Sequence, residues 1–186
     1  MLKKILLVVA ALGLILAVVV ALQPAAFSIS RSATISAPDS VVFAQLNDFH
    51  NWEAWSPWSK LDPAMKATYA GPAAGAGAEY SWAGNKDVGE GRMTILESTP
   101  SSAVRIKLEF LAPFAATNTA VFTLTPTTNG TIVVWTMTGR NNFMAKGANL
   151  VMNMDKMVGG DFEKGLAQLK TISEAAVPAP LAAPAP

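Results

Sequence analysis

The sequence predicts an α+β fold in which a curved antiparallel sheet of about six to seven strands surrounds one long C-terminal helix, preceded by one N-terminal transmembrane helix. Three observations predict it: an uncharged apolar run opens the chain, short segments of alternating polarity fill its middle, and an amphipathic segment lies near its end. Alternation with a period of two is typical of strands, whereas apolar residues three and four apart are typical of helices.

The N-terminal run is long enough to cross a membrane. Ile5 to Leu22 forms a stretch of eighteen residues without a charged or polar side chain, and a membrane-spanning helix needs about 17–25 residues. We therefore expect residues 1–24 to form an N-terminal membrane anchor. Because Lys3 and Lys4 precede the run, the positive-inside rule places the N-terminus in the cytoplasm and the domain in an extracytoplasmic (periplasmic) space.

A cleaved signal peptide is the alternative, since it also has a basic start and an apolar middle. Val19 and Ala21 are the small residues that would precede a cut after Ala21, and the domain would then be secreted. The apolar run is longer than the roughly 7–15 residues of a usual signal core, and Gln23-Pro24 resembles a juxtamembrane boundary. These features favour the uncleaved anchor.

Composition excludes several classes of protein. The chain has 14 Lys and Arg against 13 Asp and Glu, and without Lys3 and Lys4 the remainder has 12 against 13. Nucleic-acid binding requires a basic face, which is lacking here. The absence of cysteine excludes disulfides, thiol nucleophiles and thiolate metal sites. We expect one folded domain over residues 28–174 that is stabilised by its apolar core alone.

The C-terminal residues differ in composition from the domain. Residues 175–186 contain only Ala, Pro, Val and Leu, and their four prolines rule out a continuing helix. We expect a disordered tail, which offers a site for a protein partner.

The first part of the domain contains a strand and two short helices. Alternation between Phe27 and Ile35 predicts the strand. Pro38 suits the start of a helix that ends near Asp48, and a second short helical segment is expected from Trp52 to Trp58.

The middle of the domain is a series of six strands separated by turn residues. They are expected at residues 65–69, 78–82, 91–98, 103–110, 117–125 and 131–138. In the fourth, Val104, Ile106 and Leu108 share one face, while Arg105 and Lys107 share the other. Such alternation indicates an antiparallel sheet with one covered face.

The last element is a long amphipathic helix. Its apolar residues recur at three- and four-residue spacings from Leu150 to Ile172. Gly159-Gly160 interrupts the pattern, and each glycine costs about 1 kcal/mol relative to alanine. We therefore expect a bend or break there.

Three segments resemble a known family. They are Asn47 to Trp58 (NDFHNWEAWSPW), Gly84 to Gly91 followed by Met93-Thr94-Ile95, and Asp161 to Lys170 (DFEKGLAQLK). They are similar to the bacterial polyketide cyclase/dehydrase-like branch of the START-like (SRPBCC) superfamily, which includes members with a single N-terminal anchor. The resemblance implies a helix-grip fold with a deep apolar pocket between sheet and helix. It also implies a hydrophobic ligand such as a lipid, sterol or polyketide, and binding more often than catalysis.

Candidate catalytic residues are sparse. His50 is the only histidine, which excludes a site built from several histidines. The carboxylates of Glu79, Glu90, Glu109 and Asp87 lie in or near strands, where outer-face solvation is the simplest interpretation. No catalytic constellation, metal site or cofactor site is predicted.

Aromatic and methionine side chains are the better candidates for a ligand site, because methionine adapts to irregular apolar molecules. Ordinary core packing is the alternative for each of them. The candidates are Trp82, Met93, Trp135, Met137, Met154 and Met157, with Trp55 and Trp58 beside Trp52 at the pocket mouth, in a structural plug, or against lipid headgroups.

We therefore expect a membrane-anchored domain that binds a hydrophobic small molecule. Two alternatives remain open: an enzyme acting as a polyketide cyclase or dehydratase, and an envelope module whose Trp-rich segment or Pro-rich tail binds a protein partner.

Overall fold

A computed structural model describes residues 1–177 of the chain. The elements are α1 (Leu2–Leu22), β1 (Ala26–Ile35), α2 (Asp39–Asn47), the 3₁₀ helix η1 (Phe49–Ala54), β2 (Lys66–Ala70), β3 (Glu79–Ala83), β4 (Glu90–Thr99), β5 (Ala103–Ala112), β6 (Ala116–Thr127), β7 (Gly130–Arg140), α3 (Phe143–Asn149) and α4 (Met154–Ala175). The tail predicted for residues 175–186 lies, from residue 178 onward, outside the described residues, so a partner bound there stays a prediction.

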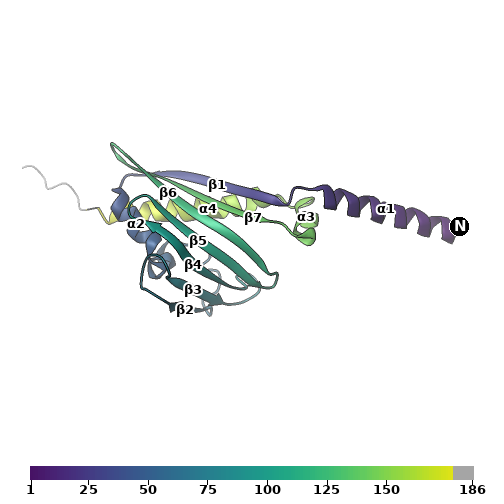
Figure 1. Ribbon diagram of the computed structural model, residues 1–186, viewed down its shortest axis with the longest axis horizontal. Coiled ribbons are helices and arrows are strands. Elements are labelled where there is room, and N and C mark those ends of the chain that lie inside the picture. Colours follow the sequence, from purple (N-terminus) through teal and green to yellow (C-terminus); the bar gives the residue numbers. More distant parts are fainter. Residues whose placement is uncertain (178–186) are drawn as a thin grey trace, which may run out of the picture.

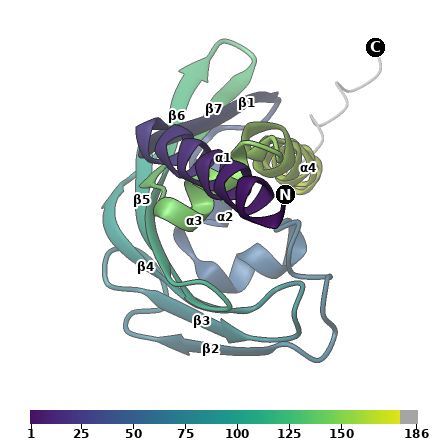
Figure 2. The ribbon, with the colours of Figure 1, turned by 90° about the vertical axis from the view of Figure 1, so that its right-hand side faces the viewer.

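The seven strands form one antiparallel sheet in the order β1-β7-β6-β5-β4-β3-β2. Viewed from the side where α1 projects, the sheet is a curved wall with α4, α2 and η1 on its concave side (Figure 2). The predicted α+β helix-grip architecture is confirmed. The first strand pairs with the last, so β1 joins the sheet beside β7 rather than beside β2.

The apolar helix α1 projects away from the domain (Figure 1). By length and composition α1 is suited either to span a membrane or to serve as a signal sequence. Only three residues separate it from β1, so α1 leaves the sheet close to the first residue of that strand. We call this end of the sheet, where β1 begins, the α1 end.

Strand register shows which segments meet at the α1 end. Ala26 at the start of β1 pairs with Arg140 at the end of β7, and the turns that join β3 to β4 and β5 to β6 lie at the same end of the strands. The turns between β4 and β5 and between β6 and β7 lie at the opposite end.

The long C-terminal helix differs from the prediction in where it is interrupted. The expected bend at Gly159-Gly160 is wrong, because α4 continues through both glycines to Ala175. The break occurs earlier, between α3 and α4, where the side chain of Asn153 caps α4 by accepting a hydrogen bond from the N–H of Lys156. The short helix expected from Trp52 to Trp58 is the 3₁₀ helix η1, which begins at Phe49 and ends at Ala54.

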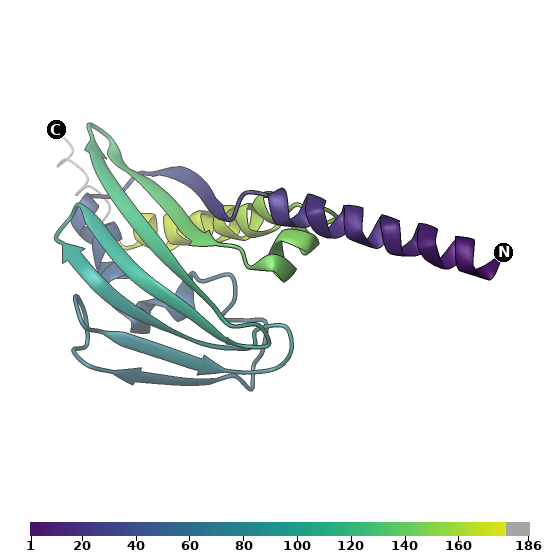
Figure 3. The ribbon, with the colours of Figure 1, turned by 45° about the vertical axis from the view of Figure 1, so that its right-hand side comes forward.

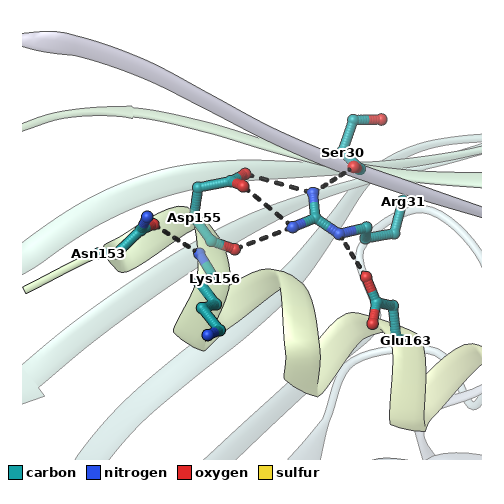
Figure 4. A network of polar contacts seen from close by, with 6 residues as sticks. All are labelled: Ser30, Arg31, Asn153, Asp155, Lys156 and Glu163. Atoms are coloured by element: carbon teal, nitrogen blue, oxygen red, sulfur yellow. Dashed lines mark hydrogen bonds and ion pairs between the residues drawn. The ribbon is translucent and has the colours of Figure 1, made fainter.

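Gly159 is required by a close approach of β1 to α4. A Cβ at Gly159 would lie 2.0 Å from the Arg31 guanidinium, whereas a Cβ at Gly160 would meet nothing within 4 Å. The Arg31 guanidinium donates to the Asp155 carboxylate at 3.0 and 3.2 Å, to the Asp155 carbonyl at 3.0 Å and to Glu163 at 2.8 Å (Figure 4). This one side chain joins the edge strand to the first three turns of α4.

The two glycines should respond in opposite ways to the same substitution. Gly160→Ala should raise the free energy of unfolding by up to about 1 kcal/mol, because alanine is the better helix former. Gly159→Ala gains the same propensity but displaces the Arg31 guanidinium, so its unfolding temperature should lie below that of Gly160→Ala. Thermal unfolding of the full chain in mild detergent, followed by circular dichroism, measures both. Equal stabilisation by the two substitutions would contradict the steric role of Gly159.

The Arg31 cluster also predicts a pH dependence. Hydrogen bonds from Arg31 hold the pKa of the Asp155 carboxyl below its ordinary value. The ion pair therefore stabilises the fold above the unfolded pKa, about 3.9 for aspartate, and this contribution is lost as the pH falls through the lower folded pKa. Asp155→Asn should flatten the acid limb of a stability-versus-pH curve. Arg31→Gln should flatten it as much, and the double variant should add nothing further.

Candidate ligand-binding cavity

A cavity of about 1250 Å³ lies between the concave face of the sheet and the helices that cover it. Its walls come from the strands, from η1 and the loop that follows it, and from the segment that leads into α4. Antiparallel register brings the wall residues together: Met93 of β4 pairs with Leu108 of β5, and Ala120 of β6 pairs with Met137 of β7. Residues of opposed strands that share a face are direct neighbours, so these side chains form an apolar surface across the four strands, interrupted at Asn118, which pairs with Leu108.

Trp82 has a fixed place in this wall. Its indole lies over Gly91 of the neighbouring strand, where an added Cβ would come within 2.3 Å of the ring. The Trp82 indole N–H donates to the carbonyl of Val88 at 3.1 Å. Gly91 therefore leaves the space that the indole occupies, and the hydrogen bond sets its orientation.

Aromatic stacking closes the cavity on the side of α4. Phe162 of α4 lies parallel to Trp135 of β7, with ring centroids 4.0 Å apart and planes 6° apart. Trp58 meets both rings edge-on. Offset and edge-to-face pairs of this kind each contribute about 0.5–1.5 kcal/mol beyond their buried area, which gives this side of the cavity a fixed shape.

The structure brings most of the predicted ligand residues to one cavity. Those that line it are Trp82, Met93, Trp135, Met137, Met154 and Trp58. Trp55 and Met157 are not lining residues: Trp55 is 1% exposed within the core, and Met157 is 52% exposed on α4. The buried indoles of Trp52 and Trp55 donate to the carbonyls of Leu46 and Gln45, so both take part in the packing against α2. Trp52 also lines the cavity.

Several cavity residues were not singled out from the sequence. Tyr80 lies on the same face of β3 as Trp82, and Leu108 and Phe110 lie on the face of β5 that the sequence had identified as apolar. Asn118 is a buried asparagine in a strand, 8% exposed. Strand alternation provided a signal for Tyr80, Leu108 and Phe110, whereas the sequence contains no signal for Asn118.

Asn118 in the cavity wall has a weak hydrogen-bond partner, and a second buried polar group, in Trp135, has none. The Asn118 amide donates to the sulfur of Met137 at 3.9 Å, and a thioether is a weak acceptor. The buried indole N–H of Trp135 has no acceptor among the described residues. A buried donor without a partner costs about 1–3 kcal/mol. The Trp135 N–H is not accessible from the cavity, so the Asn118 amide is the donor that an oxygen atom of a bound molecule would meet.

The cavity reaches the surface at the α1 end. Asp87 of the β3–β4 turn, Ala115 of the β5–β6 turn and Val151 of the α3–α4 loop all line it and are exposed. These turns and α3 lie at the α1 end of the domain (Figure 3), so the cavity is open on that side. Glu53 and Pro63, which precede β2, are further exposed lining residues.

Ionisable side chains are arranged for structure more than for proton transfer. Glu109 lies outside the cavity, where hydrogen bonds from Lys107 and Arg92 hold its pKa below the ordinary value. Asp62 is a buried lining residue, and its two carboxylate oxygens accept the backbone N–H groups of Ala64 and Asn85 at 2.9 and 2.7 Å. Burial raises the pKa of Tyr80, which keeps its phenol neutral.

The remaining candidates lie away from the cavity or at its rim. Glu79 and Glu90 do not line it, and Asp87 lies at its exposed mouth. The Nδ1 atom of His50 lies 2.7 Å from the Asp48 carboxylate, which accepts a hydrogen bond from it. The His50 ring stacks on Tyr69 but does not line the cavity. No group of three or more His, Asp and Glu side chains within residues 1–177 is placed to hold a metal ion.

Comparison with known proteins identifies relatives of the domain. A family model for polyketide cyclase/dehydrase and lipid transport proteins matches residues 26–174. No curated protein matches the chain.

Solved structures share the fold at low identity. Protein MLL2253 from Mesorhizobium loti is 16% identical, with a TM-score of 0.59 over 82% of this chain and 100% of that one. SA2116 from Staphylococcus aureus, described as of unknown function, is 8% identical, with a TM-score of 0.62 over 83% and 97%. The di-domain ARO/CYC StfQ of the steffimycin biosynthetic pathway is 12% identical, with a TM-score of 0.58 over 81% of this chain and 51% of StfQ.

At sequence identities this low, similarity to the solved structures supports a shared fold and nothing more. The family model, in contrast, matches almost the whole region from β1 to α4, which carries the sheet, the gripped helix and the cavity. This protein therefore belongs to the polyketide cyclase/dehydrase and lipid transport family of the START-like superfamily.

Proposed function

We propose that this protein is a membrane-anchored domain that binds a hydrophobic small molecule, a lipid or a polyketide-like compound, between its sheet and α4. The observation that carries the proposal is the cavity of about 1250 Å³ with its wall of aromatic, methionine and leucine side chains. Pockets for small molecules usually measure about 300–1,000 Å³, so this one has room for a long or multi-ring molecule. Each Å² of apolar ligand surface removed from water contributes on the order of 25 cal/mol.

A polar group in the wall favours an amphipathic ligand over a pure hydrocarbon. The Asn118 amide lies in a largely apolar part of the wall and has only the Met137 sulfur as acceptor. A carbonyl, hydroxyl or ester oxygen would provide a stronger one. The proposed ligand therefore has an apolar body with at least one oxygen that lies near β6 and β7.

Contacts between α1 and the domain favour an uncleaved anchor. Val20 is 5% exposed, and the ammonium group of Lys146 in α3 donates to the carbonyl of Ala21 at 3.0 Å. Cleavage after Ala21 would remove these partners. With the positive-inside rule, we propose that the N-terminus is cytoplasmic and the domain is extracytoplasmic.

The second candidate function is a cyclase or dehydratase acting on a bound polyketide-like substrate. The family description and the fold shared with StfQ support it. Of the carboxylates considered from the sequence, Asp87 alone lines the cavity, at its mouth. If the protein is an enzyme of this kind, Asp87→Asn should abolish turnover of a polyketide substrate and leave its binding intact.

Ligand binding can be tested with two methionine substitutions that differ in position alone. Met93→Lys places a charge in the apolar wall, so the full chain should lose its co-purified ligand by at least tenfold in native mass spectrometry from detergent. Met157→Lys makes the same change on the exposed side of α4 and should retain the ligand. Circular dichroism confirms that both variants are folded. If the wild-type cavity is empty and ignores a panel of lipid and polyketide probes, the binding function is wrong.

Membrane anchoring has its own measurement. The full chain expressed in bacteria should stay in the membrane fraction after an alkaline carbonate wash, and its intact mass should include residues 1–21. A soluble product that begins at Leu22 would instead establish a cleaved signal peptide.

A further inference from the structure

Apolar side chains gather on the surface around the mouth of the cavity. Within residues 26–177, the large apolar side chains that are more than half exposed are Leu111 (60%), Phe114 (76%), Phe143 (54%), Met144 (73%), Val151 (87%) and Met157 (52%). They belong to the end of β5, to the β5–β6 connection, to α3, to the α3–α4 loop and to the first turn of α4. All of these segments lie at the α1 end. We call Phe114, Phe143, Met144 and Val151 the mouth patch.

Exposure of this kind is unusual for an isolated soluble surface. Clustered apolar patches on a folded domain mark contact with a protein, a ligand or a membrane. Single exposed apolar residues need no explanation, but here the most exposed ones occur at one end of the domain. The opposite turns contain Ser101-Ser102 and Thr128-Asn129 at corresponding positions.

The position of α1 determines which partner lies nearest to the mouth patch. The last turn of α1 packs on α3, where Val20 lies 3.9 Å from the Cβ position of Gly147 and Lys146 binds the carbonyl of Ala21. The N–H of Asn141, at the start of the α3 segment, donates to the carbonyl of Ala25 at 2.7 Å. These contacts hold α3 against the end of the apolar helix, so a membrane that contains α1 has its surface at the level of α3.

We propose that the mouth patch inserts into the interfacial layer of the membrane that α1 spans, so that the cavity opens directly onto that leaflet. This inference rests on the proposed membrane anchor. The occupant of the patch is the bilayer, because α3, which carries Phe143 and Met144, packs on the last turn of α1. Helices with an apolar face bury it about 5–10 Å into the boundary between headgroups and acyl chains. The apolar ligand would then enter from the leaflet without crossing water.

Several amides surround the opening. Asn141, Asn142, Asn149 and Asn153 all line the cavity near its mouth. Asn142 and Asn153 also cap α3 and α4 through their side-chain oxygens, which leaves their amide N–H groups as donors. At the depth proposed for the patch, these donors lie where the ester and phosphate oxygens of phospholipids lie.

The absence of cysteine makes the insertion depth measurable at single positions. Phe114→Cys, Met144→Cys and Val151→Cys, each in the full chain, are labelled with nitrobenzoxadiazole and reconstituted into vesicles of phosphatidylethanolamine and phosphatidylglycerol. Thr128→Cys at the opposite end of the sheet is the matched control. The three patch labels should emit at shorter wavelength than the control and be quenched at least threefold more by lipids with a nitroxide on the acyl chain.

A second variant separates insertion from mere proximity. Met144→Asp with Val151→Asp should return the Phe114→Cys label to the emission of the control, because a carboxylate in the interfacial layer opposes burial, whereas Thr128→Asp should leave it unchanged. The inference is wrong if the patch labels match the Thr128→Cys control while a carbonate wash leaves the chain in the vesicles, since the anchor then stands and the domain is held off the surface. It fails together with the proposed anchor if the wash releases the chain.

Discussion

The contact between α4 and the β1–β7 side of the sheet determines the rest of the structure. Phe162 stacks on Trp135, and Arg31 joins β1 to Asp155 and Glu163 of the same helix. Together they hold α4 over one side of the concave face, as the view from the α1 end shows (Figure 2). Because α4 does not lie over β3, β4 and β5, the apolar face of those strands is free to line a cavity.

On β4 and β5 the sheet separates apolar from charged side chains, so these strands supply the cavity with apolar side chains and not with groups for acid or base chemistry. On β4 and β5, Arg92, Lys107 and Glu109 form a network on the outer face, while Met93 and Leu108 point to the cavity. Three of the carboxylates that line it are engaged in other contacts: Asp62 with two backbone N–H groups, Asp155 with Arg31, and Asp161 with Lys164. The other two, Glu53 and Asp87, are exposed. This arrangement suits holding and orienting a molecule more than transferring a proton to it.

Periodicity predicted the elements of the fold well and their interruptions poorly. The alternation of β5 indicated which face is covered, and the spacing of apolar residues indicated α4. The prediction of a helix break at Gly159 was wrong because a glycine is needed there for another reason. It leaves room for the Arg31 guanidinium, which comes from a strand more than a hundred residues earlier. Backbone propensity is local information, whereas a steric requirement between β1 and α4 depends on the tertiary structure.

The candidate site was predictable to a similar extent. Aromatic and methionine composition directed attention to Trp82, Met93, Trp135 and Met137, which the structure gathers in one wall. Composition does not indicate which of Met154 and Met157, three residues apart on one helix, lines the cavity. That depends on the angle at which α4 lies on the sheet. Asn118 was missed because a single buried amide has no periodic signature.

Topology alone places the mouth of the cavity beside the apolar helix. Since β1 runs away from α1 and β7 is antiparallel to β1, β7 must end beside α1, and α3 and the start of α4 must follow there. Because β5 and β6 are also antiparallel to their neighbours, the β5–β6 turn lies at the α1 end as well. No particular side-chain contact is needed to bring these segments to the level at which α1 leaves the domain. Topology decides where these segments lie, and the sequence decides whether their surface is polar or apolar. The segments at the α1 end carry the exposed apolar side chains of Phe114, Phe143, Met144 and Val151.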